Sequence, residues 1–185
     1  MKKLLVLFSA LLAFCSTANA AQKQISYLEE MYLLGTISGQ GLACKSKQYH
    51  KFELLARALI VSKATSDEEQ RQGMERYTTG KINAFADMEV ENFRECGRVT
   101  PAFENQKIFN SVLYSDGRIK MYDGKMITPR KPYDASTLYQ KDPEAFVKAD
   151  AAYKKYLELA KKNRQNAPKI ELHDSRATQF SNMFN

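Results

Sequence analysis

Few residues in this sequence could carry catalytic chemistry. Its two histidines are His50 and His173. A zinc protease needs His-Glu-x-x-His, and neither histidine has that spacing. The stretch His173-Asp174-Ser175 contains the residue types of a catalytic triad, but consecutive residues cannot face one another as triad members do. We therefore predict neither a histidine-based catalytic site nor a metal site.

Acidic residues are more numerous, and two carboxylates are the usual minimum for glycoside hydrolysis. They occur at Glu29-Glu30, at Glu68-Glu69 and at Glu89, Glu91 and Glu95. These acids alternate with basic residues, as on a solvated helix face, and the sequence lacks tryptophan, which is common in sugar-binding grooves. A cell-wall hydrolase without recognisable motifs is an alternative, but we expect a non-catalytic protein that uses no cofactor.

The first twenty residues, MKKLLVLFSALLAFCSTANA, have the organisation of a bacterial signal peptide. Lys2 and Lys3 precede an apolar run, and Ala18-Asn19-Ala20 is the small-residue site that a signal peptidase cleaves. A membrane anchor and lipidation at Cys15 are alternatives, although a bulky phenylalanine precedes that cysteine. We expect a mature chain without a transmembrane segment, exported to the periplasm or secreted.

The charge balance suggests which partners the mature chain could bind. Loss of Lys2 and Lys3 lowers the net charge from +7 to +5. This excess is moderate and not clustered as in a nucleic-acid-binding protein, so we expect no nucleic acid as partner. It fits another protein or an anionic cell-envelope component, such as lipid head groups or wall polymers, and it equally fits a role in solubility.

Cys44 and Cys96 are the cysteines that remain after cleavage. In an oxidising compartment a single pair allows a single connectivity, so we predict a Cys44–Cys96 disulfide. A redox-active pair is the alternative, but the spacing does not resemble C-x-x-C. A structural bond across this loop should stabilise the fold by about 4 kcal/mol.

Residues 35–45, GTISGQGLACK, place three glycines in a segment with helical periodicity. Phosphate-binding loops need G-x-G-x-x-G or G-x-x-x-x-G-K-[ST], and this stretch has neither. Gly35, Gly39 and Ala43 recur at i, i+4 and i+8, so they share one side of a helix. We predict a helix-packing seam at which another backbone approaches closely, with Cys44 beside it.

Apolar periodicity predicts helices over residues 25–45 and 49–63, separated by a polar break at 46–48. Ser66 and Glu69 match the S-x-x-E capping box and predict the start of a long helix that ends near Cys96-Gly97 and that Gly80 could divide. We expect Pro101 to end this helical region. A last helix should begin at Asp142-Pro143 and end near residue 162, before a polar, flexible tail over 163–185.

The residue pattern changes from helical to strand-like between residues 107 and 128, where Asp116-Gly117 and Asp123-Gly124 are strong hairpin signals. We predict a three-stranded antiparallel meander. Basic residues and a tyrosine make it a candidate binding surface; the residues are Arg118, Lys120, Tyr122, Lys125, Arg130 and Lys131. Alternatively, the lysines only discourage edge-to-edge aggregation of the strands.

Taken together, the sequence predicts a mainly α protein with a small antiparallel β meander (α+β), a disulfide-stapled helical bundle in one domain over residues 21–162. The function we expect is non-catalytic binding of another macromolecule outside the cytoplasm. A periplasmic stress chaperone that exposes its helical faces is the second alternative to this function.

Overall fold

A computed structural model describes residues 25–167, so the predicted signal peptide and the predicted tail beyond residue 167 lie outside the described residues. Within that range the chain is mainly helical and carries one three-stranded antiparallel sheet, which confirms the predicted α+β class. The helices are α1 (Tyr27–Ala43), α2 (Tyr49–Lys63), α3 (Asp67–Val90), α4 (Cys96–Glu104), α5 (Pro143–Ala149) and α6 (Ala151–Gln165). The strands are β1 (Val112–Leu113), β2 (Ile119–Lys120) and β3 (Met126–Ile127), and the 3-10 helices are η1 (Lys107–Asn110) and η2 (Ala135–Leu138).

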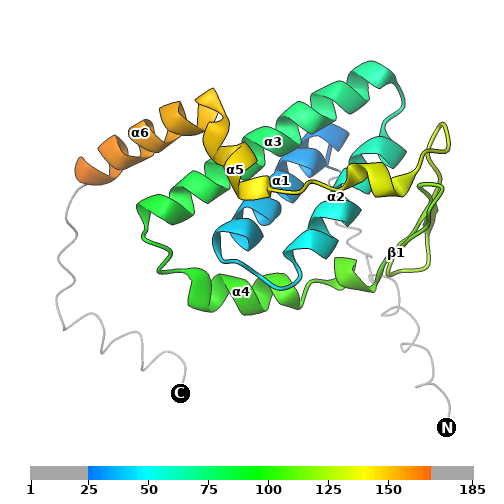
Figure 1. Cartoon of the computed structure of the whole chain (residues 1–185), viewed down its shortest axis with the longest axis horizontal. Coiled ribbons are helices and arrows are strands. Elements are labelled where there is room, and N and C mark those ends of the chain that lie inside the picture. The colour runs from blue at the N-terminus through cyan, green and yellow to red at the C-terminus, as the bar shows by residue number, and fades with distance from the viewer. Residues whose placement is uncertain (1–24, 168–185) are drawn as a thin grey trace, which may run out of the picture.

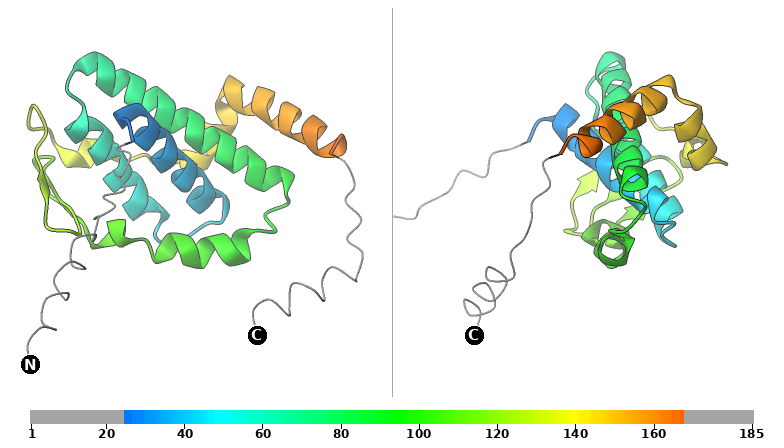
Figure 2. Two further views of the ribbon diagram at one scale, coloured as in Figure 1. Left: turned by 180° about the vertical axis from the view of Figure 1, so that it is seen from behind. Right: turned by 90° about the vertical axis from the view of Figure 1, so that its left-hand side faces the viewer.

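Helices α1 and α3 run side by side through the middle of the molecule and share its most extensive helix–helix contact within the described residues (Figure 1). Helix α2 packs against α1, and α4 crosses beneath them. The sheet lies at one end of this arrangement, whereas α5 and α6 lie at the other end (Figures 1 and 2). The long helix α3 therefore separates the two ends of the protein.

Glycines let the α1 and α3 backbones touch. A Cβ atom at Gly35 would lie within 3.0 Å of the Tyr77 carbonyl oxygen, and one at Gly39 would lie as close to the Lys81 carbonyl oxygen. From the other side, a Cβ atom at Gly80 would meet the backbone of α1 just as closely. Gly80 therefore does not divide α3, because its missing side chain makes room for α1.

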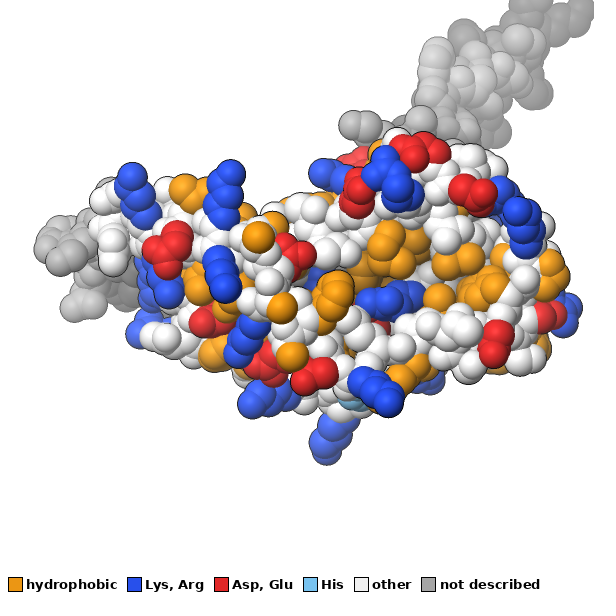
Figure 3. Space-filling view, turned by 45° about the horizontal axis from the view of Figure 1, so that its top comes forward, with side chains coloured by type: hydrophobic (Ala, Val, Ile, Leu, Met, Phe, Trp, Pro, Cys, Tyr) orange, Lys and Arg blue, Asp and Glu red, His pale blue; other side chains and the backbone are white. Residues whose placement is uncertain are grey.

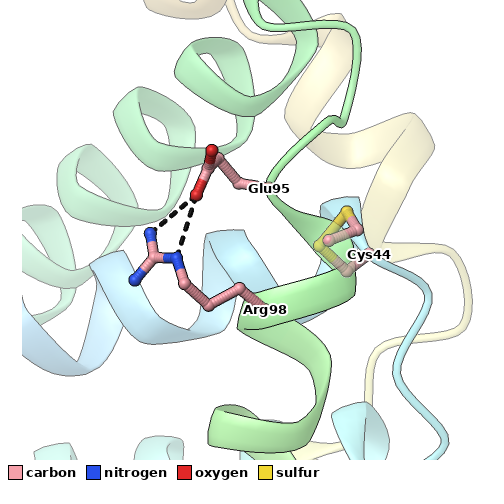
Figure 4. Close-up of a disulfide and its surroundings, with 4 residues drawn as sticks. Cys44, Glu95 and Arg98 are labelled. Carbon is pink, nitrogen blue, oxygen red and sulfur yellow. Dashed lines mark hydrogen bonds and ion pairs between the residues drawn. A yellow bond between two sulfur atoms is a disulfide. The ribbon is translucent and has the colours of Figure 1, made fainter. Parts of the chain in front are cut away.

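The predicted disulfide is confirmed: Cys44 and Cys96 are bonded, with their Cα atoms 5.3 Å apart (Figure 4). Cys44 caps the C-terminus of α1, and Cys96 is the first residue of α4. The bond therefore ties α1 to the start of α4, because the long helix ends at Val90 and not near Cys96 as predicted. Beside it, the Arg98 guanidinium pairs with Glu95 at 2.7 Å, so the adjoining turn carries its own ion pair.

The helix boundaries after residue 90 differ from those predicted. Helix α3 ends at Val90, because Asn92 and Phe93 adopt left-handed backbone conformations that reverse the chain. Helix α4 then continues through Pro101 to Glu104, so the prediction that Pro101 ends the helical region is wrong. Burial of Phe103, which is 2% exposed, outweighs the hydrogen bond that a proline removes from a helix.

The last helix is also two helices. Asp142 caps α5 as predicted, its side chain accepting a hydrogen bond from the Ala145 amide at 3.0 Å. Asp150 then interrupts the helix in an extended conformation and caps α6 through the Ala152 amide at 2.8 Å. The second cap was missed because the apolar stripe continues across the break. Helix α6 also extends three residues beyond the predicted end.

The sheet packs on α2 through its central strand. Ile119 is fully buried and lies in one apolar cluster with Ala58 and Leu59 of α2. Ser62, also on α2, donates a hydrogen bond to the carbonyl oxygen of Gly117 at 3.0 Å. These contacts fix the orientation of the sheet, so one of its faces points to α2 and the other to solvent.

Candidate functional site

The solvent side of the sheet carries a row of large exposed side chains. In the antiparallel register Val112 lies opposite Lys120, and Lys120 lies opposite Met126. Because side chains alternate between the two faces of a strand, burial of Ile119 directs Lys120 outward. Val112 is 49% exposed, Met126 45% and the nearby Tyr122 51%. We call these four residues, Val112, Lys120, Tyr122 and Met126, the outer sheet face.

The predicted basic residues divide into two groups. Lys120, Lys125 and Lys131 are exposed and form no ion pair within residues 25–167. Arg118 and Arg130 are each paired internally. The structure therefore brings Lys120 and Tyr122 together on the sheet, with Lys125 in the second turn. Arg130 and Lys131 lie beyond β3, outside the sheet.

Both arginines pair with aspartates. The Arg118 Nε atom lies 2.7 Å from Asp116, and its guanidinium stands over the ring of Tyr114 at 5.3 Å. The backbone amide and the guanidinium of Arg118 together hold the pKa of Asp116 below its usual range. Arg130 pairs with Asp67 at the start of α3. These arginines therefore stabilise the first turn and anchor the segment after β3, which leaves the lysines as the unpaired charges.

The two Asp-Gly turns hold the sheet in different ways. Gly117 and Gly124 both have φ of +86°, the left-handed conformation that the hairpin prediction required. A Cβ atom at Gly117 would clash with the ring of Tyr133, whereas nothing lies within 4 Å of the corresponding position at Gly124. The first turn is therefore packed against the protein body, and the second projects into solvent beside the outer sheet face.

A buried polar cluster around Glu53 was not predicted. The Glu53 carboxylate accepts hydrogen bonds from the Ser38, Tyr49 and Tyr77 hydroxyls at 2.8, 2.9 and 2.8 Å. It also pairs with Lys81 at 3.1 Å. The side chains of Glu53 and Lys81 are 5% and 4% exposed. We call these five residues, together with Arg57, the Glu53 cluster.

Electrostatics in this cluster favour the ionised carboxylate. Burial by itself would raise the pKa of Glu53, but the charges of Lys81 and Arg57 and the hydrogen bond from Tyr77 outweigh burial and lower it to about 2. Arg57 contributes a hydrogen bond from Nε at 2.7 Å. Because every near neighbour donates to the carboxylate, the cluster is internally satisfied, and we assign it to stability rather than to chemistry.

Three of the acidic residues considered for hydrolysis, on α3 and in the turn after it, each have a partner of their own. Glu89 accepts a hydrogen bond from the Tyr153 hydroxyl, Glu91 pairs with Arg164 at 3.3 Å, and Glu95 pairs with Arg98. Each carboxylate is thus engaged by a different partner on the surface of α3 or in the turn that follows it.

The remaining candidates from the sequence are placed as follows. His50 is exposed on α2 with its ring centroid 6.1 Å from that of Tyr139, and His173 lies outside the described residues. Among residues 25–167, no three histidine, cysteine or acidic side chains gather where they could hold a metal ion. In the same range, none of the helices is both long and apolar enough to cross a membrane.

Hollows on the surface lie along α3, beside the disulfide and next to the segment that follows β3. The last of these, of about 210 Å³, is lined by Arg130, Lys131 and Tyr133 among others. A groove of about 520 Å³ follows one side of α3, where Met74, Thr78 and Ile82 line it. It is closed at one end by Asp150 and Ala152, at the junction between α5 and α6. A hollow of about 380 Å³ lies beside the disulfide. The charged side chains along the larger groove are Asp67, Arg71, Glu75 and Asp150. Arg71 pairs with Glu75, Asp67 pairs with Arg130, and Asp150 caps α6.

Comparisons with known proteins add no relationship. No protein-family model, no curated protein and no solved structure gives a significant match to this chain. Its function must therefore be argued from its own surfaces.

Proposed function

We propose that this chain is an exported, non-catalytic protein that binds another protein through the outer sheet face, and that the contacted surface of this partner is acidic. One observation carries the proposal: three large side chains, Val112, Tyr122 and Met126, stand about half exposed around Lys120. Scattered exposed apolar residues are ordinary, but a contiguous group on one face is typical of an interaction site.

The composition of this face favours a protein as the partner. Tyrosine and methionine are enriched in protein–protein interfaces, because both bury much apolar area and methionine adapts to irregular surfaces. Tyr114, which is 37% exposed, adds a second aromatic ring near the first turn. A purely electrostatic contact with a polymer would not need these apolar groups.

Charge indicates the acidic character of the partner. Lys120 on the outer sheet face and Lys125 at the second turn are both exposed and form no ion pair within the described residues, whereas Arg118 is paired with Asp116. Unpaired lysines at the rim of an apolar patch attract an acidic surface and increase the association rate. The disulfide supports the exported location, since such bonds persist in oxidising compartments.

The test captures partners from a periplasmic extract with the chain from Ala21 onward. One variant carries Lys120→Glu and Lys125→Glu, and a second carries Val112→Ser and Met126→Ser. We expect both variants to lose the captured partner. The matched control carries Lys154→Glu and Lys155→Glu on α6, at the far end of the molecule, and we expect it to retain the partner.

Far-UV circular dichroism would verify that each variant is folded. Capture of the same partner by both sheet variants, at wild-type yield, would exclude the outer sheet face as the contact surface. Loss of the partner in the control as well as in the lysine variant would show that net charge, and not this face, determines binding.

A further inference from the structure

Helix α6 carries a second charged surface, at the opposite end of the protein from the sheet. One side of the helix packs on α3 and its neighbours, with Tyr153 buried and Tyr156 and Leu157 partly buried. At 3.6 residues per turn, six exposed residues of the other side fall within an arc of about 160°. We call these six residues the lysine face; they are Lys154, Lys155, Glu158, Leu159, Lys161 and Lys162.

The lysines of this face are not neutralised by neighbours. Within residues 25–167 none of the four forms an ion pair, and Glu158 is the single carboxylate among them. By contrast, the adjacent Lys148 pairs with Glu144, and Arg164 pairs with Glu91. Figure 3 shows basic side chains standing over this end of the molecule. The face therefore carries an uncompensated positive charge along the helix.

The lysine face lies outside the hollows described above. None of its four lysines lines the hollow along α3, the one beside the disulfide or the one next to the segment after β3. Helix α6 instead projects past the helical body, so its outer side can meet a flat surface (Figure 2). Fifteen residues of helix span about 22 Å, more than twice the screening length at physiological ionic strength.

We propose that the lysine face binds the surface of a bilayer that contains anionic lipids. The lysine ammonium groups sit on flexible side chains and can therefore each reach a separate lipid head group on a flat membrane. Each lysine adds its own contribution to the attraction by the negative membrane surface. Recognition of nucleic acid or of a single phosphate group favours the planar fork of arginine, which this face lacks. Leu159, 51% exposed at one border of the face, can enter the interface between head groups and acyl chains.

This inference does not depend on the proposed protein partner, because the two surfaces lie at opposite ends of α3 (Figure 1). If both are correct, the protein would hold its partner near a membrane. Each can be tested while the other fails.

The experiment measures co-sedimentation of the chain from Ala21 onward with phosphatidylcholine vesicles, with and without phosphatidylglycerol. We expect binding only when phosphatidylglycerol is present. Replacing the four lysines of the lysine face by glutamine should weaken binding by at least about a hundredfold, because each lysine contributes about fivefold. The matched control replaces four exposed lysines at the sheet end and should bind within a few-fold of wild type; these are Lys107, Lys120, Lys125 and Lys131.

Two single variants guard against a folding artefact. Glu158→Gln removes the one negative charge of the face and should strengthen binding by about fivefold. Leu159→Ser should weaken binding to vesicles severalfold without changing the affinity for soluble polyglutamate.

Three outcomes would overturn the proposal. The lysine-face variant could bind as wild type does, or the sheet-end control could be weakened equally. Finally, soluble polyglutamate could bind as tightly as vesicles do, and Leu159→Ser could leave vesicle binding unchanged. These two results together would identify a general polyanion site instead.

Discussion

Replacing Glu53 by glutamine tests the role that we assign to the Glu53 cluster. The glutamine keeps the size of the side chain but removes its charge, so Lys81 and Arg57 lose their shared counter-ion. The Lys81 side chain is only 4% exposed and cannot regain water without a local rearrangement. Removing one partner of a buried ion pair typically costs about 3–5 kcal/mol, so we expect Glu53→Gln to lower the free energy of unfolding by that amount.

The lowered pKa of Glu53 gives the pH dependence of this stabilisation. A pKa of about 2 in the folded chain, against an ordinary value of 4.5, corresponds to about 3 kcal/mol of stability. Because folding lowers this pKa, the contribution is fully present above about pH 4.5 and is lost as the pH falls toward 2. Burial also lowers the pKa of Lys81, so part of this contribution is offset by the cost of burying the ammonium group.

Urea denaturation followed by far-UV circular dichroism, at several pH values between 7 and about 2, measures both effects. We expect the wild-type protein to lose stability over the acid part of this range more steeply than Glu53→Gln does. The control is Glu68→Gln, whose carboxylate pairs with Arg71 on the surface and is 59% exposed. We expect this change to have little effect on stability, because solvent screens an exposed pair. Equal stability of wild type and Glu53→Gln near pH 7, or identical acid profiles, would refute this account of the cluster.

Three further predictions concern the helices and the disulfide. Gly39→Leu should destabilise the protein by at least about 3 kcal/mol, because the Cβ atom alone would meet the Lys81 carbonyl oxygen. Leucine is the better helix former, so a gain of stability in urea denaturation would disprove the close approach of α1 and α3. Replacing Cys44 and Cys96 together by serine should cost about 4 kcal/mol, since the bond closes a loop with a sequence separation of 52; an unchanged melting temperature would contradict this. Ser66→Ala should lower the free energy of unfolding by about 1 kcal/mol, because the Ser66 hydroxyl accepts a hydrogen bond from the Glu69 amide at 3.0 Å. Ser66→Gly should lower it less, and equal losses of stability in the two variants would contradict a capping role.

Local signals in the sequence predicted the fold well where one short segment decides the structure. The cap at Ser66 and the turns at Gly117 and Gly124 depend on side chains or backbone angles within four residues, and all three are present. The capping box is modified, however. The Glu69 carboxylate accepts hydrogen bonds from the amide and the hydroxyl of Thr65, both at 2.6 Å, instead of from the Ser66 amide.

Features that depend on distant residues were not predictable in the same way. Glu53 and Lys81 are 28 positions apart, and each resembles an ordinary charged residue on an amphipathic helix. One signal was available, because Glu53 interrupts the apolar run between Phe52 and Leu55, a position that helical spacing directs inward. Likewise, the exposure of Val112 and Met126 on the outer sheet face depends on strand register, which the alternation in β2 alone does not fix.

The backbone contact between α1 and α3 has a mechanical consequence. Where two helices meet through side chains, small rotamer changes let them slide, but backbone atoms in direct contact have no such freedom. With 24 residues, α3 is about 36 Å long, and α1 stiffens it along much of that length. The pair thus acts as a rigid spacer, so a ligand seated on the sheet and one held by α6 would be kept at a constant separation.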